Sequence, residues 1–212
     1  MTGSQETLRY HYVWSSIWSF EGGEPTVASS YPLGEAQFIS RLILVTGGAR
    51  AGKSRFAQRF AEQGPYRKRL FVATAVACDP EMRERIARHQ RSRNGLWKTL
   101  EEPTQLPERL PKRELQPGTV VLVDCLPTFV SNLLLQEQSS AQIKKRIRAF
   151  LKTCQQPGVT TLFVSNEVGL GLVPEHPLGR VFRDLLGEVN QLVAASADEV
   201  QLLVAGLPVR LK

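Results

Sequence analysis

A glycine-rich stretch ending in lysine and serine is the strongest chemical signal in the sequence. Residues 47–54 read Gly-Gly-Ala-Arg-Ala-Gly-Lys-Ser and fit the phosphate-binding pattern G-x-x-x-x-G-K-[ST]. An apolar run precedes them and a helical pattern follows, the context in which backbone N–H groups and a helix N-terminus bind phosphate. A chance glycine-rich turn is the alternative. We expect nucleotide binding by Gly47, Gly48, Ala49, Arg50, Ala51, Gly52, Lys53 and Ser54.

The lysine and serine of this loop have separate expected roles. Lys53 should be catalytic, because its ammonium can reach the β- and γ-phosphates, and the hydroxyl of Ser54 should bind Mg²⁺. The metal needs a second ligand, and the apolar run Val120–Val123 ends at Asp124. An acid at a strand end is often only a turn residue. Beside a phosphate loop it predicts a site for nucleotide-bound Mg²⁺ formed by Ser54 and Asp124.

A histidine lies among five arginines in residues 81–93, which read EMRERIARHQRSR. Arginine suits a polyphosphate because its guanidinium pairs with two oxygens at once. Composition alone favours the interpretation that this segment is a solvated basic face of a helix. The alternative that His89 is a chemically active residue is less favoured by composition. A phosphate loop by itself leaves three classes open: a small-molecule kinase, a mechanical or nucleic-acid-driven ATPase, and a non-catalytic nucleotide switch.

Short apolar runs alternate with helical patterns from residue 41 onward. Fully apolar runs separated by helices predict a parallel sheet covered on both faces. The predicted fold class is α/β, a three-layer P-loop NTPase-like domain with a mostly parallel sheet. No element is predicted for the proline- and charge-rich residues 91–117. Strands are predicted at 42–45, 70–73, 120–123, 161–164, 200–204 and just after 206–208, and helices at 52–62, 79–90, 126–135, 142–154 and 178–195.

The first forty residues differ from the rest of the 212-residue chain. Residues 1–40 carry a net charge of −3 and residues 41–212 a net charge of +10, which suits anionic ligands. We expect 1–40 to be a poorly ordered N-terminal extension and 41–212 to be the P-loop domain. A docking arm using Trp14 and Trp18 is the alternative.

Composition and cysteine usage exclude several classes of protein. The average composition excludes collagen-like, coiled-coil and wholly disordered chains. No apolar run reaches the roughly 20 residues that span a bilayer, so no transmembrane segment is predicted. Three cysteines without CxxC spacing predict free thiols in a reducing compartment rather than a zinc site, and we expect a cytoplasmic protein.

Three blocks resemble the bifunctional adenosylcobinamide kinase / adenosylcobinamide-phosphate guanylyltransferase family of cobalamin biosynthesis. They are GGARAGKS, then EMRERIARHQRSR with Trp97 beyond it, then VSNEVGLGLVPEHPLGRVFRDLLGEVNQLVAASADEV. The resemblance covers residues 41–212 in the same order, and its most specific block is residues 166–200. Residues 1–40 have no counterpart in it.

The resemblance implies a specific pair of reactions. The family phosphorylates the aminopropanol hydroxyl of adenosylcobinamide with ATP or GTP. It then moves GMP from GTP onto adenosylcobinamide phosphate through a GMP–histidine intermediate. The histidine of the family corresponds to His89 in this sequence. The family's fold is recombinase-like, and its relatives form trimers, so a homo-oligomer is expected. The implied nucleotide contacts beyond the phosphate loop are Thr74, Ala75, Gln90, Arg91, Ser92, Arg93, Glu101 and Asp124.

The sequence leaves rival functions possible and offers further candidate residues. One rival is a P-loop small-molecule kinase or recombinase-like ATPase without guanylyl transfer. The basic stretch 144–148 is the only candidate for binding nucleic acid, and its helical spacing indicates a solvated face, so no nucleic-acid partner is predicted. Glu167 follows a strand end and His176 lies in a loop, so both are candidates for site roles. For three other residues we expect structural roles: Cys125 as a small core residue, and Arg183 and Asp184 in ion pairs with other residues.

Overall fold

The structure is a computed structural model that describes residues 18–21, 24–27, 39–76, 83, 84, 87, 91 and 95–212. Contacts divide the chain into two units, Met1–Ala36 and Gln37–Lys212. In the first unit, β1 (Trp18–Glu21) and β2 (Glu24–Val27) pair antiparallel. This ribbon was not predicted, and most of the expected N-terminal extension lies outside the described residues.

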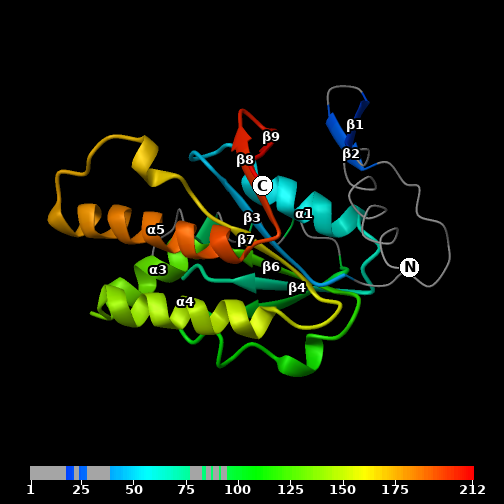
Figure 1. The fold of residues 1–212 in the computed structure, drawn as a ribbon, viewed down its shortest axis with the longest axis horizontal. Coiled ribbons are helices and arrows are strands. Elements are labelled where there is room, and N and C mark those ends of the chain that lie inside the picture. Colours follow the sequence, from blue (N-terminus) through cyan, green and yellow to red (C-terminus); the bar gives the residue numbers. More distant parts are fainter. Residues whose placement is uncertain are drawn as a thin grey trace, which may run out of the picture. The chain divides into compact units, whose positions relative to one another are not determined.

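The second unit is built on a seven-stranded sheet with the order β5-β4-β6-β7-β3-β8-β9, of which Figure 1 labels every strand except β5. All strands are parallel except β9, which pairs antiparallel with β8. The strands are β3 (Arg41–Gly47), β4 (Lys68–Ala73), β5 (Trp97–Glu101), β6 (Thr119–Asp124), β7 (Thr160–Val164), β8 (Glu199–Val204) and β9 (Leu207–Arg210).

Helices cover both faces of this sheet. The helix α1 (Lys53–Gln63) packs on β3, β6 and β7, while α3, α4 and α5 pack on one another. These three helices span Leu126–Leu135, Ser140–Cys154 and Pro177–Ser196, and two 3₁₀ turns span Lys112–Glu114 and Val168–Leu170. In the described part of the chain, every helix is too short or too polar to cross a lipid bilayer.

Successive side chains of the central strands enter two different apolar layers, as strand geometry requires. Leu42 and Leu44 belong to the core shared with α3, α4 and α5. Ile43 and Val45, which alternate with them along β3, are also buried, on the opposite face of the sheet. Strands buried on both faces read as continuous apolar runs, which is why the sequence marks them so clearly.

Three phenylalanines form the centre of the larger layer. Phe150 of α4 lies edge-on to Phe129 of α3 and to Phe163 of β7, with ring centroids 6.2 and 5.4 Å apart. All three side chains are at most 1% exposed. Edge-to-face contacts of this kind add to the free energy gained from burial alone.

The predicted fold class, a three-layer α/β domain with a mostly parallel sheet, is confirmed. The six predicted strands correspond to β3, β4, β6, β7, β8 and β9, and four predicted helices correspond to α1, α3, α4 and α5. The edge strand β5 and the 3₁₀ turn Lys112–Glu114 lie in the stretch for which no element was predicted. The helix predicted at 79–90 falls largely outside the described residues.

We predict that Phe150→Ala lowers the free energy of unfolding by about 3–5 kcal/mol, because it leaves a cavity between α3, α4 and β7. Leu135→Ala is the control, since that side chain is 68% exposed and its loss should cost at most about 0.5 kcal/mol. Urea unfolding followed by circular dichroism measures both. Similar losses in the two variants would contradict the described core.

Candidate active site

The carboxyl ends of the parallel strands bring most of the predicted site residues to one edge of the sheet. The phosphate loop follows β3, Thr74 follows β4, Glu101 ends β5 and Asp124 ends β6. In open α/β sheets this is the edge at which ligands bind. The strand β7 lies between β3 and β6, with Val164 paired to both Val45 and Asp124.

The phosphate loop ends where α1 begins, as the sequence predicts. Gly52 caps the helix in the left-handed region (φ 93°), and its carbonyl accepts a hydrogen bond from the backbone N–H of Phe56. Lys53 is buried, and its Nζ donates a hydrogen bond of 2.5 Å to the carbonyl oxygen of Gly48. The ammonium is therefore folded back over the loop, and its expected contact with bound phosphate stays a prediction.

The hairpin of β8 and β9 packs against this loop. Both strands were predicted from the sequence, but their contact with the loop was not. The backbone N–H of Gly206 donates to the carbonyl oxygen of Ala51 at 3.1 Å. Gly47 has a φ of 145°, and a Cβ added there would overlap the carbonyl oxygen of Leu203. The signal available in the sequence was the turn dipeptide Ala205-Gly206 between two apolar runs.

Thr74 links the ends of β4 and β6. Its hydroxyl donates to the carbonyl of Cys125 at 2.8 Å and accepts from the N–H of Cys125 at 2.9 Å. The backbone N–H of Thr74 also bonds the carbonyl of Asp124 at 3.3 Å. Thr74 thereby fixes the half-buried Asp124 at the sheet edge, and its expected contact with nucleotide stays a prediction.

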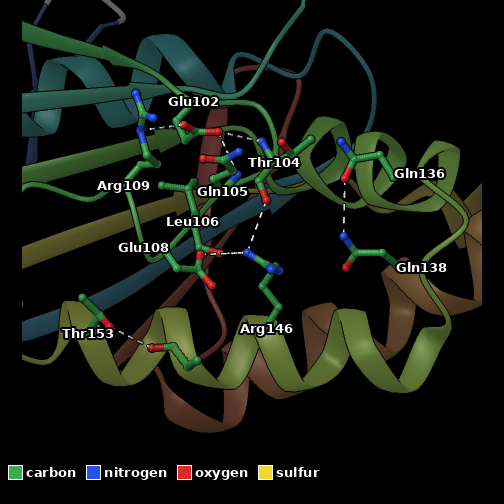
Figure 2. A network of polar contacts seen from close by, with 11 residues as sticks. Glu102, Thr104, Gln105, Leu106, Glu108, Arg109, Gln136, Gln138, Arg146 and Thr153 are labelled. Carbon is green, nitrogen blue, oxygen red and sulfur yellow. Dashed lines mark hydrogen bonds and ion pairs between the residues drawn. The ribbon is translucent and has the colours of Figure 1, made fainter.

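Two adjacent acids at the end of β5 differ in what they contact. Glu101 is exposed, whereas Glu102 is buried and accepts hydrogen bonds from the backbone N–H groups of Thr104 and Gln105 (Figure 2). Glu102 also pairs with Arg109 at 3.6 Å. Glu102 therefore holds the loop after β5, while Glu101 and the half-buried Ala75 stay predicted nucleotide contacts.

The basic helix α4 uses two of its cations within the fold. Arg146 donates to the carbonyl of Leu106 at 3.1 Å and pairs with Glu108 at 2.7 Å (Figure 2). Lys144 pairs with Glu188 of α5 at 2.6 Å. Lys145 and Arg148 of the same stretch are exposed, as a solvated face requires, and the absence of a nucleic-acid partner stays a prediction.

An apolar pocket of about 620 Å³ opens at the same edge, between the loops after β4 and β5 and the helices α3 and α5. Val76, Leu135 and Phe182 supply apolar surface, and Thr104 and Thr128 supply hydroxyls. A pocket of this volume with a few polar groups suits part of a small-molecule ligand.

The segment with the predicted nucleophile lies largely outside the described residues. His89, Gln90, Ser92 and Arg93 are among the residues not described, and Arg91 is exposed. Their expected roles stay predictions.

Comparison with known proteins assigns the family. Residues 43–211 match the family model described as cobinamide kinase / cobinamide phosphate guanyltransferase. The chain belongs to this family. It is 39% identical over 183 residues to the bifunctional adenosylcobalamin biosynthesis protein CobU of Escherichia coli K12, a match that covers 81% of this chain and 99% of that protein.

Two further relatives agree. CobU of Salmonella typhimurium LT2 is 40% identical over 183 residues, covering 81% of this chain and 99% of the relative. The bifunctional adenosylcobalamin biosynthesis protein CobP of Pseudomonas aeruginosa is 41% identical over 169 residues, covering 80% and 96%. As a member of the cobinamide kinase / cobinamide phosphate guanyltransferase family, the chain is a transferase.

The fold is also similar to a solved structure from Pyrococcus horikoshii OT3, described as a structural study of Project ID PH0250. That similarity has a TM-score of 0.50 at 8% identity and covers 82% of this chain and 87% of the other. It supports the fold alone.

Four other residues of this cobinamide kinase family member that the sequence analysis singled out contact parts of the fold itself. Arg183 and Asp184 pair with each other at 2.8 Å, so the expectation that each pairs with other residues was wrong: the guanidinium is long enough to reach its neighbour's carboxylate. His176 caps α5, because its Nδ1 accepts from the N–H of Leu178 at 3.3 Å. Cys125 is half-buried at the N-cap of α3, not in the core as expected, because it directly follows the sheet edge.

Cys154 is a free thiol inside the core. Burial raises the pKa of the Cys154 thiol to about 12, although a hydrogen bond with Thr161 lowers it. The thiolate is the nucleophilic form of cysteine, so Cys154 is unsuited to group transfer near neutral pH.

We predict that Gly47→Ala destabilises the enzyme by at least about 1–3 kcal/mol, because alanine is strained at this φ and its Cβ overlaps Leu203. Gly48→Ala is the matched control, since a Cβ there meets no atom within 4 Å. Thermal unfolding of the nucleotide-free proteins measures both. An equal melting temperature for Gly47→Ala and the wild type would contradict the close packing of the loop on β8.

Proposed function

We propose that this enzyme carries out two consecutive transfers to a corrinoid. It phosphorylates the aminopropanol hydroxyl of adenosylcobinamide with ATP or GTP. It then transfers GMP from GTP to that phosphate, giving adenosylcobinamide-GDP and pyrophosphate. The observation that carries the proposal is the phosphate loop, with its buried Lys53, in a chain that belongs to the cobinamide kinase / cobinamide phosphate guanyltransferase family.

The phosphate loop supplies what both transfers need from the protein. Its backbone N–H groups and the N-terminus of α1 attract the phosphate oxygens. Lys53, placed over the loop by its bond to Gly48, neutralises charge that develops on the transferred group or on pyrophosphate. One loop can therefore serve a γ-phosphoryl transfer in the first reaction and bind the leaving pyrophosphate in the second.

The residues present fit nucleotide-bound Mg²⁺. Ser54 lies in the first turn of α1 and Asp124 at the end of β6, the strand against which α1 packs. A hydroxyl and a carboxylate are the hard oxygen ligands that Mg²⁺ prefers. When bound, the ion neutralises phosphate charge, and Ser54 and Asp124 would hold it.

His89 is the proposed nucleophile of the second reaction. An imidazole nitrogen attacks the α-phosphorus of GTP, pyrophosphate leaves, and the phosphate of adenosylcobinamide phosphate then displaces the histidine. Among the described residues, Cys154 is unsuited as the nucleophile, because it is buried as a thiol. A homotrimer and a cytoplasmic location stay predictions.

We predict that Lys53→Ala lowers the rates of both transfers by roughly 10²–10³, by analogy with the loss of one donor to a developing oxyanion. Lys145→Ala removes the same charge from an exposed position of α4 and should leave both rates unchanged. Steady-state assays with adenosylcobinamide and with adenosylcobinamide phosphate measure the two transfers. A normal kinase rate in Lys53→Ala would place the kinase site elsewhere.

We predict that His89→Ala takes no label from α-³²P-GTP and makes no adenosylcobinamide-GDP, because alanine offers no nucleophile, but still phosphorylates adenosylcobinamide. In the wild type the label should be acid-labile and base-stable, as a phosphoramidate requires, and peptide mapping should place it on His89. His176→Ala is the matched histidine control and should label normally.

Two results would contradict this assignment. Covalent GMP on His89→Ala would identify another nucleophile. Wild-type protein that binds GTP and phosphorylates adenosylcobinamide, but never labels, would leave the second candidate function, a simple small-molecule kinase.

A further inference from the structure

Glu167 lies against the first residue of the phosphate loop, although the family match assigns it no role. It follows β7, the strand between β3 and β6, and begins the 3₁₀ turn Val168–Leu170. Its backbone N–H donates to the carbonyl oxygen of Gly47 at 3.1 Å. The side chain therefore starts at the sheet edge where the triphosphate is expected.

One oxygen of this carboxylate is fixed by two buried donors. Oε1 accepts hydrogen bonds from the hydroxyl of Thr46 at 2.6 Å and from Nδ2 of Asn190 at 3.2 Å. Thr46 is 3% and Asn190 8% exposed, whereas Glu167 is half-buried. Within the described ranges, Oε2 receives no hydrogen bond from another side chain or from the backbone.

Asn190 is itself held by a polar network that joins α5 to the end of β7. Its Oδ1 accepts from the hydroxyl of Ser165 at 2.5 Å, and its Nδ2 donates to the carbonyl of Asn166 at 3.0 Å. The backbone N–H of Ser165 bonds the carbonyl of Val45 at 2.9 Å. Three elements therefore fix the orientation of Glu167, which is the preorganisation that a catalytic group requires.

An acid in this position needs a reason, because a carboxylate repels the triphosphate beside it. A chain that needed only to close the network could satisfy Thr46 and Asn190 with a neutral acceptor such as glutamine. A carboxylate adds two properties that glutamine lacks, which are a negative charge that binds metal ions and the ability to accept a proton. Because Ser54 and Asp124 are the proposed Mg²⁺ ligands, accepting a proton is the property left for Glu167. The kinase reaction releases a proton from the attacking hydroxyl, whereas guanylyl transfer to a phosphate does not.

We infer that Glu167 is the general base of the kinase reaction, an inference that rests on the proposed function. The hydroxyl oxygen of the aminopropanol group forms a bond to the γ-phosphorus while its proton passes to Oε2 of Glu167. The bond between the γ-phosphorus and the β–γ bridging oxygen breaks, and the nucleoside diphosphate leaves with that electron pair. Glu167 then returns the proton to solvent.

Glu167→Gln tests this role with little change in shape, because the amide oxygen can still accept from Thr46 and Asn190. We expect the kinase kcat to fall by about 10²–10⁴, the usual contribution of general-base catalysis. Labelling by α-³²P-GTP and transfer of GMP to supplied adenosylcobinamide phosphate should stay within about threefold of the wild type.

Glu175→Gln makes the same chemical change at an exposed position of the neighbouring loop and should leave both reactions intact. A kinase kcat in Glu167→Gln within threefold of the wild type would overturn the inference. An equal loss of both reactions would also overturn it, because Glu167 would then support the shared nucleotide site. If wild-type enzyme fails to phosphorylate adenosylcobinamide, the proposed function itself fails and this role falls with it.

Discussion

The buried ammonium group of Lys53 constrains the conformation of the phosphate loop and the approach of the strand beside it. The Lys53 side chain is 7% exposed, and a charge at that depth is tolerated only where polar groups surround it. The loop meets this need by turning its own carbonyl at Gly48 toward the ammonium. That turn requires glycine backbone at Gly47 and Gly52, and Gly47 in turn allows β8 to approach.

The same edge collects side chains from strands far apart in the sequence. Thr74 holds the end of β6, and with it Asp124, while Asn190 and Thr46 hold Glu167. The bonds of Thr74 fix the backbone of Asp124, whereas those of Thr46 and Asn190 fix the carboxylate of Glu167. An acid beside a polyphosphate can bind a metal ion or accept a proton, which agrees with the separate tasks proposed for Asp124 and Glu167.

Much of this arrangement could be predicted from the sequence, and the exceptions have physical causes. Strands buried on both faces read as apolar runs, but β5 is a mostly exposed edge strand whose Trp97 packs on Phe71 and so carried no such signal. The predicted start of α4 missed its first two residues, although Ser139 and Gln142 form a capping box. The phosphate loop is a local motif. The network around Glu167 joins residues more than twenty positions apart, which no local pattern reveals.

We propose that one phosphate loop per chain serves both transfers. Equilibrium dialysis with β,γ-imido-GTP counts the nucleotide sites, using the His89→Ala enzyme so that no covalent transfer consumes the ligand. We expect one bound nucleotide per chain and its loss when Lys53 is also replaced by alanine. Two nucleotides per chain, or one that persists without Lys53, would contradict a single shared site.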